Sequence, residues 1–265
     1  MKYEADIGIF GGSGFYNLLD DMTEVMIDTP YGAPSDKIAL GTIQGKRVAF
    51  LPRHGKEHTL PPHKINYRAN IWAMKQLGVT RILGPCAAGS LQPHIKPGDF
   101  VILYQFVNRT WGRKDTFFDG PKVAHVSPAE PYCPELRQHA FKVANKHKFS
   151  VHEKGTMVVI NGPRFSTKAE SREFSRHGWD AIGMTQYPEG YLALEQEICY
   201  CGIALITDYD SGLEGNPDIP PVSHADVLKV FSQNIDKMKQ LIFSLVESIS
   251  LDRNCPCQHA TKGSQ

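Results

Sequence analysis

The sequence predicts an α/β fold with a mixed, largely parallel central sheet flanked by helices. Short apolar runs without polar alternation recur along the chain, which is typical of strands covered on both faces. Segments with helical spacing of apolar residues separate several of these runs. The chain has 265 residues, 41% of them hydrophobic, so it fits one α/β domain or two smaller ones. We assign residues 1–250 to a single domain and residues 251–265 to a cysteine-containing tail.

The apolar runs end at small or polar residues, and this feature points to a site. In α/β sheets a ligand lies beyond the carboxyl ends of the strands, so we expect the residues that follow the runs to converge on one pocket. Two further strands are expected at residues 100–106 and 156–160. The runs that end in this way lie at residues 7–10, 48–51, 82–83, 158–160, 181–182 and 203–206.

Three helices have recognisable boundaries. The helix over residues 66–77 stops at Gly78, and Thr167 with Glu170 has the pattern of a capping box. Ser223 is placed to cap a long helix with apolar residues at helical spacing. The segment 108–134 lacks periodicity, which is uncommon in a compact domain unless the segment is functional or packs on a partner. We expect it to contact another subunit.

The composition excludes several classes of protein. The chain has 29 basic and 28 acidic residues, a balance that argues against broad binding to nucleic acid or to a membrane surface. No apolar run approaches the roughly 18–20 residues of a spanning helix. The first residues turn at once into a strand-like run and leave no room for a signal peptide, so we expect a cytoplasmic protein.

The cysteines do not predict a metal site. Four of the six lie in or beside apolar segments, where a reduced cysteine behaves as a small hydrophobe. The tail pair Cys255 and Cys257 looks exposed and lies near His259. A zinc site needs about four ligands, usually from two such pairs, and only one pair is present. A disulfide or an inert tail is favoured, and we expect no bound metal.

Two motifs favour binding of an anion. Gly11-Gly12-Ser13-Gly14 after a strand can present backbone N–H groups and the Ser13 hydroxyl, although the motif taken alone favours a plain tight turn. Arg53 and His54 follow the next apolar run, where an arginine can bind phosphate oxygens in a bidentate way. A surface arginine beside a packed histidine is the alternative. The small residues from Cys86 to Ser90 allow close backbone approach to a ligand, or close strand–helix packing.

Two other motifs favour recognition of a heterocycle. Phe165, at the start of a helix, can stack on a flat ring, although phenylalanine is more often part of a core. Asp208 and Asp210 lie at the end of an apolar strand, where two carboxyl groups are costly unless they are used. One carboxyl can protonate a leaving nitrogen while the other accepts a hydrogen bond from an amine. An Asx-type turn is the alternative reading.

Taken together, these strings resemble the 5′-methylthioadenosine phosphorylases of the trimeric purine nucleoside phosphorylase superfamily. The resemblance runs from about residue 7 to residue 245 and is carried by GGSG, TPYGAPSD, LPRHG, NYRANIWA, AAGSL, PGDFV, GTMVVINGPRFSTKAES, GMTQYPE and TDYD. It implies that Asp208 and Asp210 read adenine, that Phe165 stacks on the purine and that Met184 contacts the sugar. The phosphate site that it implies consists of Ser13, Arg53, His54, Cys86, Ala87 and Thr185.

The resemblance also implies a homotrimer, or a multiple of it, in which a neighbouring subunit lends His125 near the 5′ end of the nucleoside. We assign Ser166, His224 and His125 to specificity. The chain departs from the family at Cys86, where a hydroxyl residue is usual. It departs again at His224, where methylthioadenosine phosphorylases have an apolar residue and 6-oxopurine phosphorylases have a histidine that meets a 5′-hydroxyl. A preference for adenosine is therefore the alternative to methylthioadenosine.

The implied reaction is phosphorolysis in purine and methionine salvage, with inorganic phosphate as co-substrate and no metal or organic cofactor. Phosphate would stabilise positive charge on the ribose while Asp208 protonates the leaving purine. Two other classes remain open: a nucleosidase that uses water, against which Arg53 and His54 argue, and a nucleoside-binding protein without catalysis.

Overall fold

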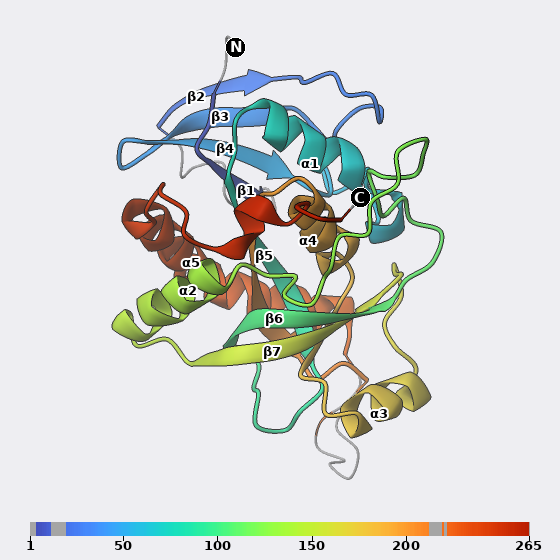
Figure 1. The fold of residues 1–265 in the computed structure, drawn as a ribbon. Helices are drawn as coiled ribbons and strands as arrows, with labels where there is room; N and C mark the ends of the chain where they lie inside the picture. The colour runs from blue at the N-terminus through green and yellow to red at the C-terminus, as the bar shows by residue number, and fades with distance from the viewer. Residues whose placement is uncertain (1–3, 12–19, 212–218, 220–221, 265) are drawn as a thin grey trace.

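Among the residues that the computed structural model describes, nine strands form one mixed sheet with helices on both faces (Figure 1). The structure describes residues 4–11, 20–211, 219 and 222–264. The strands are β1 (Ile7–Gly11), β2 (Asp20–Val25), β3 (Ile38–Ile43), β4 (Lys46–Pro52), β5 (Arg81–Ser90), β6 (Phe100–Arg109), β7 (Val151–Ile160), β8 (Ala181–Gly183) and β9 (Cys199–Asp208). The helices are η2 (Pro62–Lys64), α1 (Tyr67–Gln76), α2 (Pro134–Lys146), α3 (Lys168–Arg176), α4 (Gln186–Glu195), α5 (His224–Ser248) and η3 (Pro256–His259).

The sheet closes on itself at one side. Its strand order is β2-β3-β4-β1-β5-β8-β7-β6-β9, and β9 also pairs with β5. The pairings β1–β4, β1–β5, β5–β9, β6–β7 and β7–β8 are parallel, whereas β2–β3, β3–β4, β5–β8 and β6–β9 are antiparallel. The predicted mixed, largely parallel sheet is therefore confirmed, with closure through β5 and β9 as an added feature.

Helices cover both faces of the sheet, as the absence of polar alternation predicts. One core cluster joins the sheet to α1 and α4, through residues such as Ile71 and Leu192. The other joins it to α2 and α5, through residues such as Ala140 and Leu241. Figure 1 shows these two pairs of helices on opposite sides of the strands. Strands between two such layers can be apolar along their whole length.

The predicted helix boundaries are confirmed. The Asn66 side chain accepts from the Ala69 N–H at the start of α1, and Gly78 takes the left-handed conformation (φ +84°) after its end. Thr167 and Glu170 form both halves of a capping box on α3. The Ser223 side chain caps α5 by accepting from a backbone N–H in its first turn.

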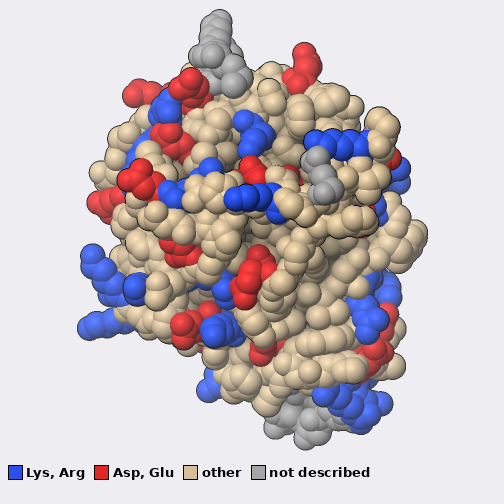
Figure 2. All heavy atoms as spheres, viewed as in Figure 1, with Lys and Arg blue, Asp and Glu red and all other residues tan. Residues whose placement is uncertain are grey.

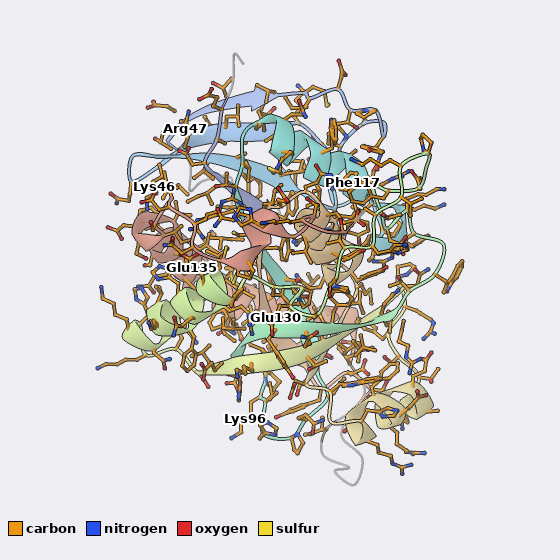
Figure 3. All side chains as sticks on the ribbon, in the orientation of Figure 1. Lys46, Arg47, Lys96, Phe117, Glu130 and Glu135 are labelled. Atoms are coloured by element: carbon orange, nitrogen blue, oxygen red, sulfur yellow. The ribbon has the colours of Figure 1, made fainter. Side chains whose placement is uncertain are left out.

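Lys46 holds the other end of α5. Its ammonium group donates to the carbonyl oxygens of Val246 and Glu247, each at 2.8 Å. Figure 3 shows Lys46 on the β4 side of this helix end. A cation at a helix C-terminus satisfies carbonyl groups that have no partner within the helix.

One strand is longer than the sequence suggests. The small residues from Cys86 to Ser90 were expected to follow a strand, but they form the second half of β5. Small residues are needed there because neighbouring groups approach the strand closely. A Cβ atom on Gly84 would lie 1.9 Å from the Tyr200 hydroxyl oxygen, and one on Gly89 would lie 2.8 Å from Asp208 Oδ1.

The aperiodic segment has no helix or strand over residues 110–133 and packs partly on its own chain. Arg113 donates to the carbonyl oxygen of Asn161 at 3.0 Å, and the Phe117 N–H donates to Glu195 Oε2 at 2.7 Å. Trp111, by contrast, is 76% exposed. The expected contact of this segment with another subunit stays a prediction.

The expectation that the cysteine tail is exposed is wrong. Cys255 and Cys257 are each only 4% exposed, because the chain after α5 folds back over the start of β9. No helix among the described residues is long and apolar enough to cross a membrane. On the face that Figure 2 shows, basic and acidic side chains are interspersed over the described surface.

Candidate active site

One cavity of about 600 Å³ lies among the carboxyl ends of β1, β4, β5, β8 and β9 and the first half of α5. A cavity of this size suits a small molecule such as a nucleoside. Most of the predicted site residues line it: Arg53, His54, Cys86, Ala87, Phe165, Met184, Thr185, Asp208 and Asp210. The predicted convergence of strand ends on one pocket is therefore observed.

Arg53 and Glu189 form a buried ion pair beside this cavity. Arg53 Nε donates to Glu189 Oε2 at 2.9 Å, and Nη2 donates to Oε1 at 2.7 Å. Nη1 donates to the Pro85 carbonyl oxygen at 2.8 Å. Burial lowers the pKa of Arg53, but the Glu189 carboxylate more than offsets this, so the pKa is raised overall. These bonds use three of the five guanidinium N–H groups, and the others can bind an anion.

His54 is a neutral imidazole at neutral pH. Burial, together with the nearby Arg53 charge, lowers its pKa to about 4. Its Nδ1 lies 2.8 Å from the Leu60 carbonyl oxygen. A carbonyl only accepts, so Nδ1 carries the proton and Nε2 is left as an acceptor. The ring stacks on His58, with centroids 4.5 Å apart, and this contact fixes its plane.

Cys86 and Thr185 are next in sequence to residues that meet near Arg53: Arg53 donates to the Pro85 carbonyl oxygen, and Gln186 donates to the Gly84 carbonyl oxygen. Burial raises the pKa of the Cys86 thiol to about 11, so it is not a thiolate at neutral pH. Thr185 is the N-cap of α4 but makes no capping hydrogen bond with its side chain. Its hydroxyl thus remains for a ligand, which suits the predicted phosphate contact.

Asp208 and Asp210 stand at the end of β9 in a buried setting. Burial raises the pKa of both carboxyl groups. Asp208 Oδ1 accepts from the Asp210 N–H at 2.7 Å, so the Asx-type turn is present. The Asp210 Oδ2 atom is buried without a hydrogen-bond partner among the described residues. Such an unpaired acceptor is costly unless a ligand satisfies it, so the Asx-type turn is compatible with a ligand-binding role for these residues.

Thr207 tunes the second oxygen of Asp208. Its hydroxyl donates to Asp208 Oδ2 at 2.7 Å and lies 3.3 Å from the Ala88 carbonyl oxygen. When Oδ2 carries a proton, the hydroxyl can donate to Ala88 instead. Asp208 can therefore exist in both protonation states without leaving a buried donor unpaired.

The rest of the cavity is largely apolar. Phe165, which is 38% exposed, and Met184 are among the apolar residues that line it. Residues of α5 form a further wall: Val227, Leu228, Phe231, Ile235 and Met238. A mostly apolar lining with a few convergent polar groups is typical of a small-molecule site.

Of the predicted residues whose side chains the structure describes, Ser166 and His125 do not line this cavity. Ser13 and the His224 side chain lie outside the described residues; the backbone of His224 begins α5. The Ser166 hydroxyl is buried without a partner among the described residues, while its carbonyl oxygen accepts from Ser211 at 2.6 Å. His125 is exposed, and its N–H donates to the Ser264 carbonyl oxygen at 2.7 Å. Its predicted role in a neighbouring subunit stays untested.

Glu189, His58 and the α5 wall were missed by sequence reasoning. Glu189 stands in an otherwise apolar stretch, and a carboxylate there is costly unless it has a cationic partner. That signal was available, although the partner Arg53 lies far away in the sequence. The apolar positions of α5 were identified as helical, but spacing does not tell a helix face that packs from one that lines a cavity.

Comparison with known proteins agrees with this class of site. The model of the phosphorylase superfamily matches residues 6–247, so the chain belongs to that family. It is 49% identical to a purine nucleoside phosphorylase of Streptomyces coelicolor, covering 99% of this chain and 96% of the relative. It is 48% identical to an S-methyl-5′-thioadenosine phosphorylase of Nitrosopumilus maritimus, covering 98% of each chain.

Solved structures point to the same subgroup. A methylthioadenosine phosphorylase from an antarctic soil metagenomic library superimposes with a TM-score of 0.92 at 41% identity, covering 98% of this chain and 92% of that one. The predicted family and fold are both confirmed by these comparisons.

Proposed function

We propose that this chain transfers the pentosyl group of 5′-methylthioadenosine to phosphate, giving adenine and 5-methylthioribose 1-phosphate. The observation that carries the proposal is a cavity lined by two polar groups at different points along β5: Arg53, His54 and Thr185 near Gly84 and Pro85, and Asp208 and Asp210 near Gly89. The names of the relatives, most of which are S-methyl-5′-thioadenosine phosphorylases, support it.

The first of these polar groups fits a phosphate ion. Arg53 is held in a fixed orientation by Glu189 and keeps N–H groups for an anion. The free Nε2 of neutral His54 can accept from a protonated phosphate oxygen, and the Thr185 hydroxyl can donate. As the glycosidic bond lengthens, positive charge builds on the ribose. A bound phosphate dianion stabilises that charge and then attacks C1′.

The second polar group fits an aminopurine. Burial raises the pKa of Asp208, which favours the neutral acid that can donate a proton to N7 of the leaving base. Asp210 Oδ2, which lacks a partner among the described residues, can accept from the exocyclic amine. Phe165, which lines the cavity, can stack on the purine ring.

In this proposal the 5′ substituent of the nucleoside contacts the apolar residues of α5 that line the cavity. Val227, Leu228 and Phe231 offer no hydrogen bond, so they favour a methylthio group over a hydroxyl. A preference for adenosine is the second candidate. It is supported by the relative named purine nucleoside phosphorylase and by Schistosoma mansoni structures named adenosine/methylthioadenosine phosphorylase, 37% identical to this chain. His224 at the start of α5 would then meet the 5′-hydroxyl.

The remaining expectations form part of the proposal. Phosphate serves as the co-substrate, and the reaction needs no metal or organic cofactor. The chain works in the cytoplasm as a homotrimer or a multiple of it, with His125 of one subunit completing a neighbouring site. No nucleic acid or membrane takes part.

The phosphorylase and nucleosidase chemistries differ in one product. We would incubate the full chain with methylthioadenosine and phosphate and follow the mixture by ³¹P NMR. The proposal expects a sugar 1-phosphate resonance that grows in step with adenine release. Adenine release with free methylthioribose and no new phosphorus signal would indicate hydrolysis. Tight nucleoside binding without either product would indicate a binding protein.

A further inference from the structure

Four buried cysteines meet at the start of β9, at the opposite end of the strand from the cavity residues Thr207 and Asp208. They are Cys133, Cys199, Cys255 and Cys257, and their sulfur atoms all lie within 4.8 Å of one another. All four are free thiols. From this geometry we propose that they form a tetrahedral thiolate site for one Zn²⁺ ion, separate from the catalytic centre.

The spacing of the sulfur atoms suits such an ion. Zinc–sulfur bonds of about 2.3 Å in a tetrahedron place the sulfur atoms about 3.8 Å apart. The observed separations include 3.2 Å between Cys199 and Cys255, and none exceeds 4.8 Å. No pair therefore has to move by more than about 1 Å to reach this geometry. A tetrahedral set of four thiolates binds either zinc or an iron–sulfur centre, and the proposal here is zinc.

The ligands come from three separate segments, each held by hydrogen bonds of its own. Cys133 is the N-cap of α2, and its N–H donates to the Tyr200 carbonyl oxygen at 2.9 Å. Cys199 begins β9, and its N–H donates to the Thr80 carbonyl oxygen at 3.0 Å. Their positions therefore do not depend on contacts between the sulfur atoms. The two tail cysteines complete the set.

The tail is fastened to the loop before β9. Arg253 Nη1 donates to the Glu197 carbonyl oxygen at 2.7 Å, and the Thr261 hydroxyl donates to Glu197 Oε1 at 2.5 Å. These two contacts flank Cys255 and Cys257 in the sequence. The backbone thus brings the pair against Cys199, which is the preorganisation that a metal site requires.

A buried cation stands next to the cluster. Arg81 is paired with Cys199 in the parallel register of β5 and β9 and is 1% exposed. Its Nη2 lies 3.5 Å from Glu135 Oε1, which Figure 3 shows at the start of α2, but its Nε has no hydrogen-bond partner among the described residues. Zinc with four thiolates carries a net charge of −2, so a cation with an unused N–H is the neighbour that such a site favours.

Binding needs no other reactant. Each thiol releases one proton as its sulfur binds the dication, and no electrons are transferred. A pair of disulfides would instead require an oxidant. The metal would join the tail to β9 and α2. Because the Ser264 carbonyl oxygen accepts from the His125 N–H, it would also steady the segment that carries His125.

The test is a metal analysis of the full chain, purified in the reduced state from zinc-containing medium. Inductively coupled plasma mass spectrometry should find about one zinc per chain. A mercurial reagent should release it as the cluster thiols react. The variants Cys255→Ser and Cys257→Ser should each lose most of the zinc. Cys201→Ser, a buried cysteine of β9 outside the cluster, is the matched control and should keep it.

Cobalt gives a second readout on wild-type protein, which does not depend on variants that fold. The Co²⁺-loaded chain should show the sulfur-to-cobalt charge-transfer absorption and strong visible bands of a tetrahedral thiolate site. Metal-free protein that takes up neither added Zn²⁺ nor Co²⁺ would overturn the proposal. So would disulfides among these four residues in the protein purified from the cytoplasm, or zinc that stays bound in both tail variants.

Discussion

Arg53 and Glu189 hold each other through two hydrogen bonds, at 2.9 and 2.7 Å, and both side chains are almost completely buried. The pair links Arg53, which lines the cavity, to α4, which carries Glu189. A guanidinium fixed in this way is presented to a ligand with little loss of side-chain entropy. Glu189 is therefore a positioning residue that acts through Arg53.

The first prediction concerns that pair. Glu189→Gln keeps the shape but can accept only one of the two hydrogen bonds, so we expect the KM for phosphate to rise about tenfold or more. The KM for the nucleoside should change much less. Stability should fall by about 3–5 kcal/mol because a buried charge loses its partner.

Steady-state kinetics with each substrate varied in turn, together with thermal unfolding, checks this prediction. Glu195→Gln is the matched control, since Glu195 is buried in the same helix but binds Thr116 and Phe117 rather than Arg53. An unchanged phosphate KM in Glu189→Gln would show that Arg53 does not need this support.

The second prediction concerns the proton donor. Asp208→Asn removes the acid that protonates the leaving base, so kcat for methylthioadenosine should fall about 10²- to 10⁴-fold. The preference relative to 6-oxopurine nucleosides should shift toward the latter, because an amide can donate to a 6-oxo group. Exposed Asp236→Asn on α5 should retain wild-type kinetics. If Asp208→Asn kept wild-type activity on the adenine nucleoside, Asp208 would not be the proton donor.

The third prediction concerns stability at alkaline pH. A carboxyl whose folded pKa is raised binds its proton more tightly in the native state, so stability declines as pH rises above the unfolded value of 3.8. Asp208→Asn removes this penalty. We expect the variant to exceed wild type in Tm by about 2–4 °C for each 1 kcal/mol gained. Thermal unfolding measured at pH 4 and at pH 8 should show a higher Tm for Asp208→Asn than for the wild type at pH 8 only.

The fourth prediction concerns His54 at acidic pH. Its folded pKa of about 4 lies below 6.5, the usual pKa of a solvated histidine, so the unfolded chain binds more protons between these values. The stabilisation is complete above pH 6.5 and is lost as pH falls toward 4, by at most about 3 kcal/mol. Between pH 5 and pH 7, urea unfolding should show a smaller change in the free energy of unfolding for His54→Gln than for the wild type. The exposed His177→Gln should behave as wild type, and an identical profile for His54→Gln would contradict the assignment.

The fifth prediction separates the two candidates for the 5′ pocket. Val227→Ser places a hydroxyl in the apolar wall, so kcat/KM for methylthioadenosine should fall about 10- to 100-fold and that for adenosine much less. His224→Val should leave the methylthioadenosine value within about twofold. If His224→Val lowers kcat/KM for adenosine by more than Val227→Ser lowers kcat/KM for either nucleoside, a preference for adenosine is favoured instead.

The sequence predicted the layers and the site better than the connections between distant segments. Buried strands and helix caps are local, so the absence of polar alternation and the caps at Thr167 and Ser223 were sufficient to place elements. The strand-end rule then grouped Arg53, Thr185 and Asp208 correctly into one cavity.

What it missed depends on tertiary contacts. The partner of Arg53 lies 136 residues away, and no local pattern links the two. The continuation of β5 through Cys86 was hidden because small residues are typical of both loops and tightly packed strands. Counting cysteine pairs along the chain could not group these four sulfur atoms for the same reason, since Cys133 and Cys199 lie near the tail pair only in the folded protein.

The most direct test of the proposed function is adenine release from methylthioadenosine and from adenosine, each measured with and without phosphate. The account predicts release that requires phosphate, with the larger kcat/KM for methylthioadenosine. Equal release in the absence of phosphate would contradict phosphorolysis, and a larger kcat/KM for adenosine would contradict the assignment of the α5 wall to a methylthio group.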